Sequence, residues 1–135
     1  MEILKRILGI CSTNLPQNND CWSYSDGKIE VDLNKAPELA KPEGVLRLEQ
    51  KGLKTRILIL KGKNNEFHAI ENICSHFGRR LDLVKGSEKV ECCSVNKSTF
   101  SFTGEVMAGP AKESLKTFHV EQIENKLIIE ITKKS

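Results

Sequence analysis

The residues with the clearest chemical potential are cysteines and a histidine on two short segments in the middle of the chain. Cys74 and His76 stand two positions apart in Cys-Ser-His-Phe-Gly, and Cys93 follows in Glu-Cys-Cys-Ser-Val-Asn. In an extended loop, a Cys-x-His pair can direct a thiolate and an imidazole toward one point, and both groups bind transition metals. Gly78 lets the backbone turn tightly there. The spacing predicts a site shared by two loop ends.

Cys92, next to Cys93, leaves two interpretations open. Consecutive residues of a regular strand face opposite sides, so both thiols reach one site only at a strand end or a bulge. In that arrangement the ligand set has three cysteines and one histidine: Cys74, His76, Cys92 and Cys93. In the other interpretation, Cys92 is a small buried apolar residue of a strand.

The two segments resemble the ligand loops of the Rieske 2Fe–2S family. The first loop matches the family pattern C-x-H-x-G-x-x-L at Cys74, His76, Gly78 and Leu81. Cys93, with Phe100 after it, matches the start of the second loop, and the likeness covers roughly residues 28–132. In that family two cysteines hold one iron and two histidines hold the other. The resemblance implies a 2Fe–2S cofactor and electron transfer, with Cys74, His76 and Cys93 as ligands.

The second loop departs from the family pattern. The family's second histidine falls on Asn96, and the glycine after it falls on Lys97. An amide oxygen is a hard, weak ligand compared with imidazole. If a third thiolate replaces the histidine, we expect a potential below the range of about −150 to +300 mV of His₂Cys₂ centres. Arg79 and Val95 are not cysteines, so the interloop disulfide of respiratory Rieske proteins is absent and the Rieske ferredoxins are the nearer comparison.

Two other classes of function stay open. One is a cluster-free thiol protein with a disulfide between Cys74 and either Cys92 or Cys93, and with a thiolate made reactive by nearby basic residues. The other is an inert interaction module that keeps only the fold. A Ser-His-Asp set, a phosphate-binding glycine loop and paired carboxylates do not stand out, which favours an electron carrier or small redox subunit over an enzyme. The expected partner is a protein reductase or oxidoreductase.

The remaining cysteines, histidines and arginines carry weaker expectations. Cys11 and Cys21 are too far apart for a zinc knuckle, so packing is favoured, with a reversible disulfide second. His68 and His119 lie within predicted strands and are expected to face solvent or to form hydrogen bonds. The pair Arg79–Arg80 is expected to be solvated, or to steer an acidic partner if it lies beside a cluster.

Composition restricts the surroundings in which this site works. The 135 residues include 21 basic and 18 acidic side chains, spread along the chain without a basic block, so nucleic acid is not an expected partner. An apolar run of the ~20 residues needed to cross a bilayer is missing. Charged residues interrupt the first ten positions, which argues against a secretory signal and for the cytoplasm. In that compartment, cysteines serve more often as ligands or redox thiols than as structural bridges.

The elements that must position the loops follow from residue periodicity. Residues 1–10 have helical spacing and predict a short amphipathic helix, and residues 12–28 are rich in turn formers and predict an irregular segment. Beyond them the period changes to two, which predicts strands at 28–33, 45–50, 55–61, 66–72, 89–93, 98–102, 117–123 and 126–132. Residues 34–44 have room for one helical turn. We therefore predict an N-terminal arm (1–27) and an all-β, antiparallel Rieske-like sandwich or barrel (28–135).

Overall fold

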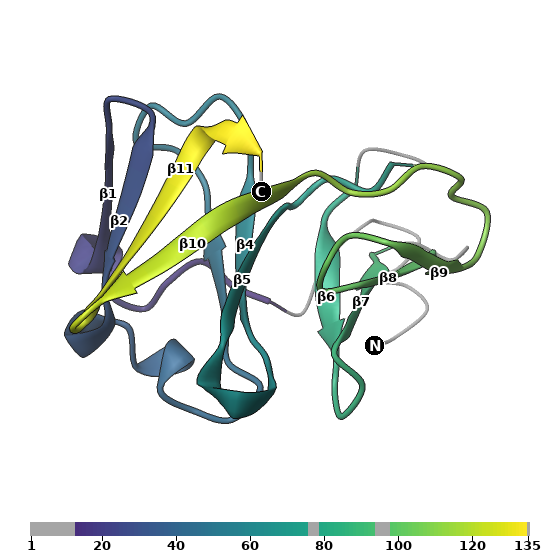
Figure 1. The fold of residues 1–135 in the computed structure, drawn as a ribbon, viewed down its shortest axis with the longest axis horizontal. Helices are drawn as coiled ribbons and strands as arrows, with labels where there is room; N and C mark the ends of the chain where they lie inside the picture. The colour runs from purple at the N-terminus through teal and green to yellow at the C-terminus, as the bar shows by residue number, and fades with distance from the viewer. Residues whose placement is uncertain (1–12, 76–78, 94–97, 135) are drawn as a thin grey trace.

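The fold was analysed in a computed structural model that describes residues 13–75, 79–93 and 98–134 (Figure 1). Strands form two antiparallel sheets over these residues. A seven-stranded sheet has the order β1-β2-β11-β10-β5-β4-β3, and a four-stranded sheet has the order β6-β7-β8-β9. The smaller sheet lies beside the larger one. This confirms the predicted all-β, antiparallel class.

The strand bounds follow the predicted pattern closely. The large sheet contains β1 (Trp22–Ser25), β2 (Lys28–Asp32), β3 (Val45–Leu48), β4 (Ile57–Lys61), β5 (Phe67–Glu71), β10 (Thr117–Ile123) and β11 (Lys126–Lys134). The small sheet contains β6 (Leu81–Val84), β7 (Lys89–Cys92), β8 (Thr99–Ser101) and β9 (Val106–Ala108). The described residues have 3-10 turns in place of α-helices: η1 (Asn19–Cys21), η2 (Leu33–Lys35), η3 (Pro37–Leu39) and η4 (Lys63–Asn65).

β4 is buried on both of its faces and therefore belongs to two apolar cores. Ile57 and Ile59 point into the core enclosed by the large sheet, whereas Leu58 and Leu60 point into a second core. Alternate side chains of a strand face opposite sides, so the continuous Ile-Leu-Ile-Leu run is what a strand between two cores requires. All four side chains are fully buried.

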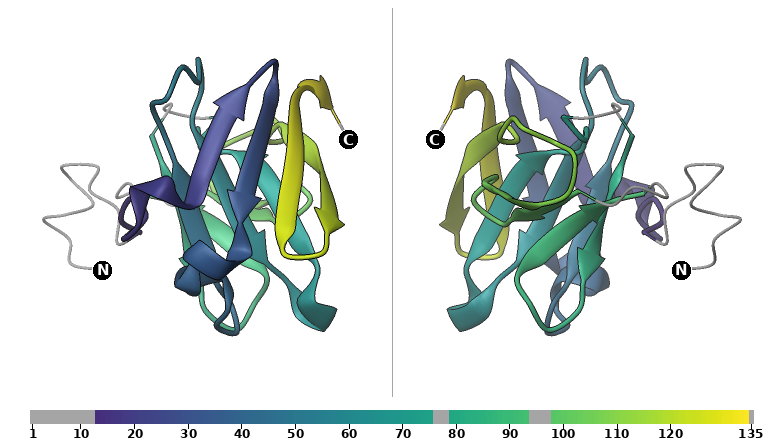
Figure 2. Two further views of the ribbon diagram at one scale, coloured as in Figure 1. Left: turned by 90° about the vertical axis from the view of Figure 1, so that its left-hand side faces the viewer. Right: turned by 90° about the vertical axis from the view of Figure 1, so that its right-hand side faces the viewer.

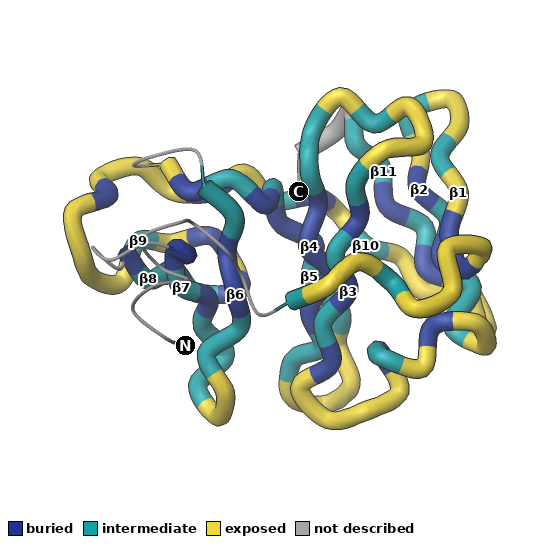
Figure 3. The backbone as a smooth tube through the Cα atoms, turned by 180° about the vertical axis from the view of Figure 1, so that it is seen from behind, coloured by how far each residue is buried: buried dark blue, intermediate teal, exposed yellow. Residues whose placement is uncertain are grey.

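The first core lies inside the curl of the large sheet. Residues of β1, β2 and β11 pack in one cluster with residues of β3 and β4 across it. The left view in Figure 2 looks onto β1 and β2 from outside this core. The second core joins the two sheets, because Leu58, Leu60 and Ile70 pack there against Leu81 and Phe100 of the small sheet. Figure 3 shows the buried stretches in the middle of both sheets.

The structure corrects the sequence prediction in one region. Residues 12–28 were expected to be irregular, but Trp22–Ser25 form β1, paired with β2. The turn between them contains Asp26 and Gly27, both with positive φ (52° and 75°), which is the Asp-Gly hairpin signal that the turn-rich composition concealed. The short strands β6 and β9 were also missed. The helical turn expected within 34–44 is present as η3, while the helix expected at 1–10 lies outside the described residues.

We expect Leu58→Ala to lower the free energy of unfolding by about 2–5 kcal/mol, because it leaves a cavity where the two sheets meet. Urea denaturation followed by circular dichroism measures this change. Ile123→Ala is the control, since Ile123 is 52% exposed and should cost less than about 0.5 kcal/mol. Equal, small effects of both substitutions would contradict the two-core description of β4.

Candidate functional site

The ends of the two cysteine loops are joined through neighbouring carbonyl groups. The backbone N–H of Cys74 donates to the carbonyl of Arg79 (2.6 Å), and the backbone N–H of Cys93 donates to the carbonyl of Arg80 (2.9 Å). Two acceptors on consecutive residues thus hold one cysteine each. Both cysteines are therefore attached by their backbones to one dipeptide, Arg79–Arg80.

Leu81 follows Arg79 and Arg80 in the chain, and Asn72 fixes its backbone. These three residues form the tripeptide Arg79–Leu81. The side-chain Oδ1 of Asn72 accepts a hydrogen bond from the N–H of Leu81 (2.7 Å), and the backbone N–H of Asn72 donates to the carbonyl of Arg56 (2.8 Å). Asn72 is fully buried, and its Nδ2 finds no acceptor among the described residues. Because an unsatisfied buried amide is costly, this donor is expected to meet an acceptor that the described chain does not supply.

Glu49 holds the side chain of Arg80 from the large sheet. Its two carboxylate oxygens accept hydrogen bonds from Arg80 Nε (2.7 Å) and Nη2 (2.9 Å). Arg47 Nε donates to the same carboxylate (2.6 Å), and Arg47 Nη1 donates to the carbonyl of Thr13 (3.1 Å). The side chain of Glu49 is 13% exposed and that of Arg80 is 33% exposed, so this bidentate ion pair is partly shielded from water.

The pKa of Glu49 shows which influence dominates at this carboxylate. Burial by itself raises the pKa, but the hydrogen bonds from Arg80 and Arg47, together with their charges, lower it to about 2. The same hydrogen bond raises the pKa of Arg80, whereas burial, followed by the charge of Arg80, lowers the pKa of Arg56. Glu49 therefore remains ionised between its arginine partners at neutral pH.

A third segment, residues 109–116, is hydrogen-bonded to Ser75 and Ser98, which flank the two cysteine loops. Ser75 Oγ donates to the carbonyl of Glu113 (2.7 Å), and Ser98 Oγ accepts from the N–H of Ala111 (3.0 Å). Ser98 also accepts from the N–H of Cys92 through its carbonyl (2.9 Å). The hydroxyl groups of two serines thus attach this segment to the first and the second loop.

Gly104 allows the same segment to approach the small sheet. It has a φ of +89°, and a Cβ added to it would lie 2.7 Å from the carbonyl oxygen of Leu115. The N–H of Leu115 donates to the carbonyl of Gly104 (2.8 Å). A side chain at position 104 would therefore displace Leu115 and the segment that contains it.

The three described cysteines of the site are all buried, but they differ in their surroundings. Cys74 and Cys92 carry thiols and pack in the core between the sheets, as the apolar interpretation of Cys92 predicted. Cys93 is disulfide-bonded, and the other half of that bond is not among the described residues. The disulfide between Cys74 and either Cys92 or Cys93, which belonged to the alternative thiol function, is not formed in this structure, because Cys74 is a free cysteine. His76, Gly78, Asn96, Lys97 and Cys11 lie outside the described residues.

The other residues singled out from the sequence do not join this site. Cys21 is buried in the large-sheet core, where burial and then the charge of Glu38 raise the pKa of its thiol; this confirms the packing role. His68 contacts the ring of Phe102, with 5.6 Å between ring centroids, and His119 is an exposed residue of β10. The expectation of a solvated arginine pair is wrong for Arg80, which is bound to Glu49.

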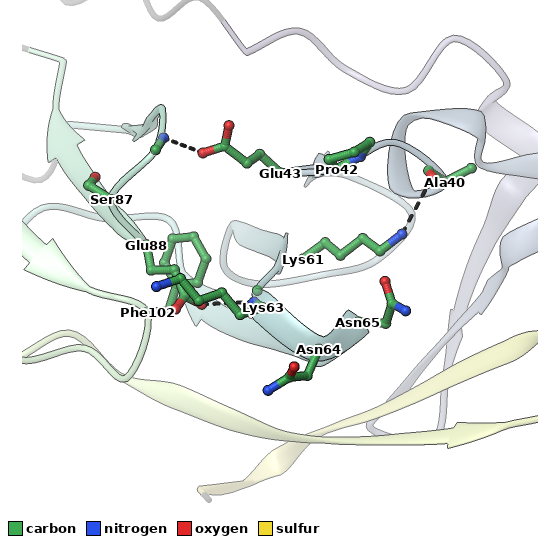
Figure 4. Close-up of a pocket in the computed structure, with 12 residues that line it drawn as sticks. Ala40, Pro42, Glu43, Lys61, Lys63, Asn64, Asn65, Ser87, Glu88 and Phe102 are labelled. Carbon is green, nitrogen blue, oxygen red and sulfur yellow. Dashed lines mark hydrogen bonds between the residues drawn. The ribbon is translucent and has the colours of Figure 1, made fainter.

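A separate pocket of about 440 Å³ opens between the turns of the two sheets (Figure 4). Two carboxylates join the sheets at this pocket: Glu43 accepts from the N–H of Gly86, and Glu88 accepts from the N–H of Lys63 (3.0 Å). Phe102 forms part of its wall. The described residues that line it come from neither cysteine loop, so the pocket is separate from the candidate site.

The fold and these loops define a class of protein: a small antiparallel β domain that carries cysteines on two loops attached to the same dipeptide, Arg79–Arg80. Residues 30–119 match the Rieske 2Fe-2S domain family, and because the match covers well over half of the chain, the chain belongs to that family. The presence of the Rieske domain supports a general role in Rieske-type electron transfer.

Among solved structures, the chain is similar to the plasma membrane Rieske protein PetC3 of the cyanobacterium Synechocystis PCC 6803. The two share 24% sequence identity over 64% of this chain and 85% of that chain, with a TM-score of 0.56, which supports the common fold. A search of curated proteins returned no match. Among the described residues, no helix is long and apolar enough to cross a membrane.

The described residues match the cysteine half of a Rieske site in sequence position, at Cys74 and Cys93. The backbone N–H groups of these two cysteines bond to the consecutive carbonyls of Arg79 and Arg80. Within the described ranges, however, no group of three His, Cys, Asp or Glu side chains is placed to hold a metal ion. The three cysteines alone are therefore not a preformed ligand set.

Sequence reasoning did not find Glu49, Asn72 or Ser98. One signal was present for Glu49: the Arg-Leu-Glu order places Arg47 and Glu49 on the same face of a strand, where opposite charges pair. Asn72 and Ser98 had no comparable signal, because the partners of their side chains are distant backbone groups that the tertiary fold brings to them.

We expect the stability of Glu49→Gln to depend less on acid pH than that of the unmodified protein. The folded-state pKa of Glu49 lies below its ordinary value, so its contribution is complete above the unfolded-state pKa and is lost as pH falls toward about 2. Urea unfolding between about pH 5 and pH 2 measures the slope. An identical slope in both proteins would show that the ion pair does not form.

We expect Asn72→Leu to cost about 1–3 kcal/mol of folding free energy, because it leaves the buried N–H of Leu81 without its acceptor. Thermal and urea unfolding measure this effect. Asn34→Leu makes the same chemical change at an exposed position and is the control. If both variants unfold like the parent protein, Asn72 does not hold the tripeptide.

Proposed function

We propose that this Rieske-family protein carries electrons through a 2Fe–2S cluster held by the two cysteine loops, with Cys74, His76 and Cys93 as ligands. The fourth ligand comes from Cys92 or from position 96, where the family histidine is replaced by Asn96. A bound cluster of this kind supplies one-electron chemistry. The observation that carries the proposal is the pair of hydrogen bonds that attach Cys74 and Cys93 to consecutive carbonyls.

The surrounding residues support the proposal by fixing this position. Asn72 and Glu49 hold the tripeptide between the cysteines, and residues 109–116 are hydrogen-bonded to Ser75 and Ser98 beside the two loops. Fixed ligands reduce the rearrangement that accompanies electron transfer. The proposed partner is a protein reductase or oxidoreductase, and the cytoplasm stays a prediction for the location.

A second candidate function is favoured by one observation: Cys93 is disulfide-bonded. A sulfur in a disulfide cannot bind iron, so ligand formation by Cys93 first requires reduction. If the reduced chain does not take up iron, the proposed activity is thiol–disulfide exchange at Cys93 on a Rieske scaffold.

The test is anaerobic reduction of the full chain, followed by addition of ferrous iron and sulfide and removal of excess reagent. We expect about two iron and two sulfide per chain, with visible absorption, because a 2Fe–2S cluster has this composition. Cys74→Ser and Cys93→Ser should each abolish uptake. Cys21→Ser is the matched control, because it removes a buried thiol from the other core and should retain full uptake.

Two further variants distinguish the possible fourth ligands. If Cys92 is a ligand, Cys92→Ser loses iron, and the potential of the loaded parent protein lies below about −150 mV. Asn96→His restores the family residue and should raise the potential toward the His₂Cys₂ range. A colourless parent protein that binds no more iron than Cys74→Ser would refute the cluster, and a gain of two titratable thiols on reduction would then support thiol exchange.

A further inference from the structure

The pocket between the two sheets carries charges of both signs beside an aromatic wall (Figure 4). Its volume of about 440 Å³ falls in the range of sites for small organic molecules. The large sheet contributes Lys61 at the end of β4 and Lys63 in η4. The small sheet contributes Glu88, which precedes β7, and the buried Phe102, which follows β8. One cavity thus holds ammonium groups, a carboxylate and an aromatic ring from both sheets.

Lys61 supplies an ammonium group whose hydrogen-bonding capacity is mostly unused. The residue is half-buried, and its Nζ donates to the carbonyl of Ala40 over a long 3.4 Å. Among the described residues this ammonium group has no other partner, although it carries several donors. Unused donors of a cation that lines a pocket are suited to bind the carboxylate of a ligand, which also matches the charge.

Glu88 supplies a carboxylate that is fixed at one oxygen and open at the other. Its Oε2 accepts from the backbone N–H of Lys63 (3.0 Å), and its Oε1 has no partner among the described residues. Gly62 makes room for this carboxylate, because a Cβ there would lie 2.6 Å from Oε2. Glu88 has a φ of 51°, which is uncommon for glutamate, and such conformations gather at functional sites. The fixed carboxylate is therefore a ready acceptor for the ammonium group of a ligand.

We propose that this pocket binds a small zwitterion with an apolar side chain, of the free amino acid class. The carboxylate of the ligand binds Lys61, its ammonium group binds Glu88, and its apolar part contacts Phe102. Figure 4 shows Lys61 directed toward Ala40 and Glu88 beside Phe102, on different sides of the pocket. A ligand that satisfies both charged residues therefore carries both charges itself.

The charge balance of the pocket disfavours a purely anionic ligand such as a phosphate ester. Lys61 and Lys63 are matched by Glu43 and Glu88, so the four charges of the described lining cancel. An anion meets two carboxylates there, and a cation meets two ammonium groups, whereas a zwitterion presents the opposite charge to each. The described lining comes from neither cysteine loop, so this binding site is separate from the proposed electron transfer.

The experiment titrates the isotope-labelled full chain with L-phenylalanine and follows the backbone amide resonances of Gly62, Lys63 and Gly86 by NMR. We expect saturable shifts with a dissociation constant on the order of 0.1–1 mM. Phenylpropionate lacks the ammonium group and phenethylamine lacks the carboxylate. Each analogue should bind about tenfold more weakly, because it loses one charge-assisted hydrogen bond.

Two variants assign the two charges of the ligand to their partners. Lys61→Gln should weaken phenylalanine and phenylpropionate about tenfold and leave phenethylamine unchanged. Glu88→Gln keeps an oxygen that can accept from Lys63, and it should weaken phenylalanine and phenethylamine but not phenylpropionate. Lys28→Gln and Glu121→Gln change exposed residues outside the pocket and are the matched controls.

Three results would overturn the proposal. The first is the absence of saturable shifts with phenylalanine. The second is equal or tighter binding of inorganic phosphate or of either singly charged analogue. The third is a variant, Lys61→Gln or Glu88→Gln, that loses all three ligands alike, which would indicate a structural role. None of these measurements requires iron, so their failure leaves the proposed cluster untouched.

Discussion

The tripeptide Arg79–Leu81 is the feature on which the candidate site depends. Its first two carbonyls hold the backbones of Cys74 and Cys93, and its third residue is held by the side chain of Asn72. The cysteines and Asn72 that form these hydrogen bonds are buried, so breaking one bond would leave polar groups without partners. The arginine side chain that leaves this tripeptide is bound by Glu49. Two loops distant in sequence are thus fixed to one short stretch of backbone.

This arrangement needs a scaffold in which the two sheets cannot move independently. β4 provides it, because the strand contributes Ile57 and Ile59 to one core and Leu58 and Leu60 to the other. Carboxylates reinforce the contact between the sheets: Glu43 and Glu88 each accept a backbone N–H from the opposite sheet. Apolar burial supplies most of the stabilisation, while the carboxylates fix orientation and register.

The parts of this structure that follow from local pattern could be predicted from the sequence. Period-two alternation identified eight of the strands, and the Cys-x-His segment with Cys93 identified two loops that do adjoin. The residue pattern did not predict the strands whose formation depends on long-range contacts.

β1 follows a turn-rich stretch and is held by the burial of Trp22. β6 and β9 are short strands that pair within the small sheet. Glu49 and Asn72 were missed because their partners are about ten to thirty residues away. The disulfide state of Cys93 was also not predictable, since spacing alone does not choose among five cysteines.

The chain therefore combines a Rieske-family scaffold with a second loop in which an amide replaces the imidazole. Iron-edge anomalous diffraction from crystals of the reduced, anaerobically reconstituted protein tests the central claim most directly. We expect anomalous density at the junction of the two loops, with the sulfurs of Cys74 and Cys93 bonded to the same iron atom. Crystals without such density, or with these two sulfurs directed to opposite sides of the tripeptide, would contradict the account.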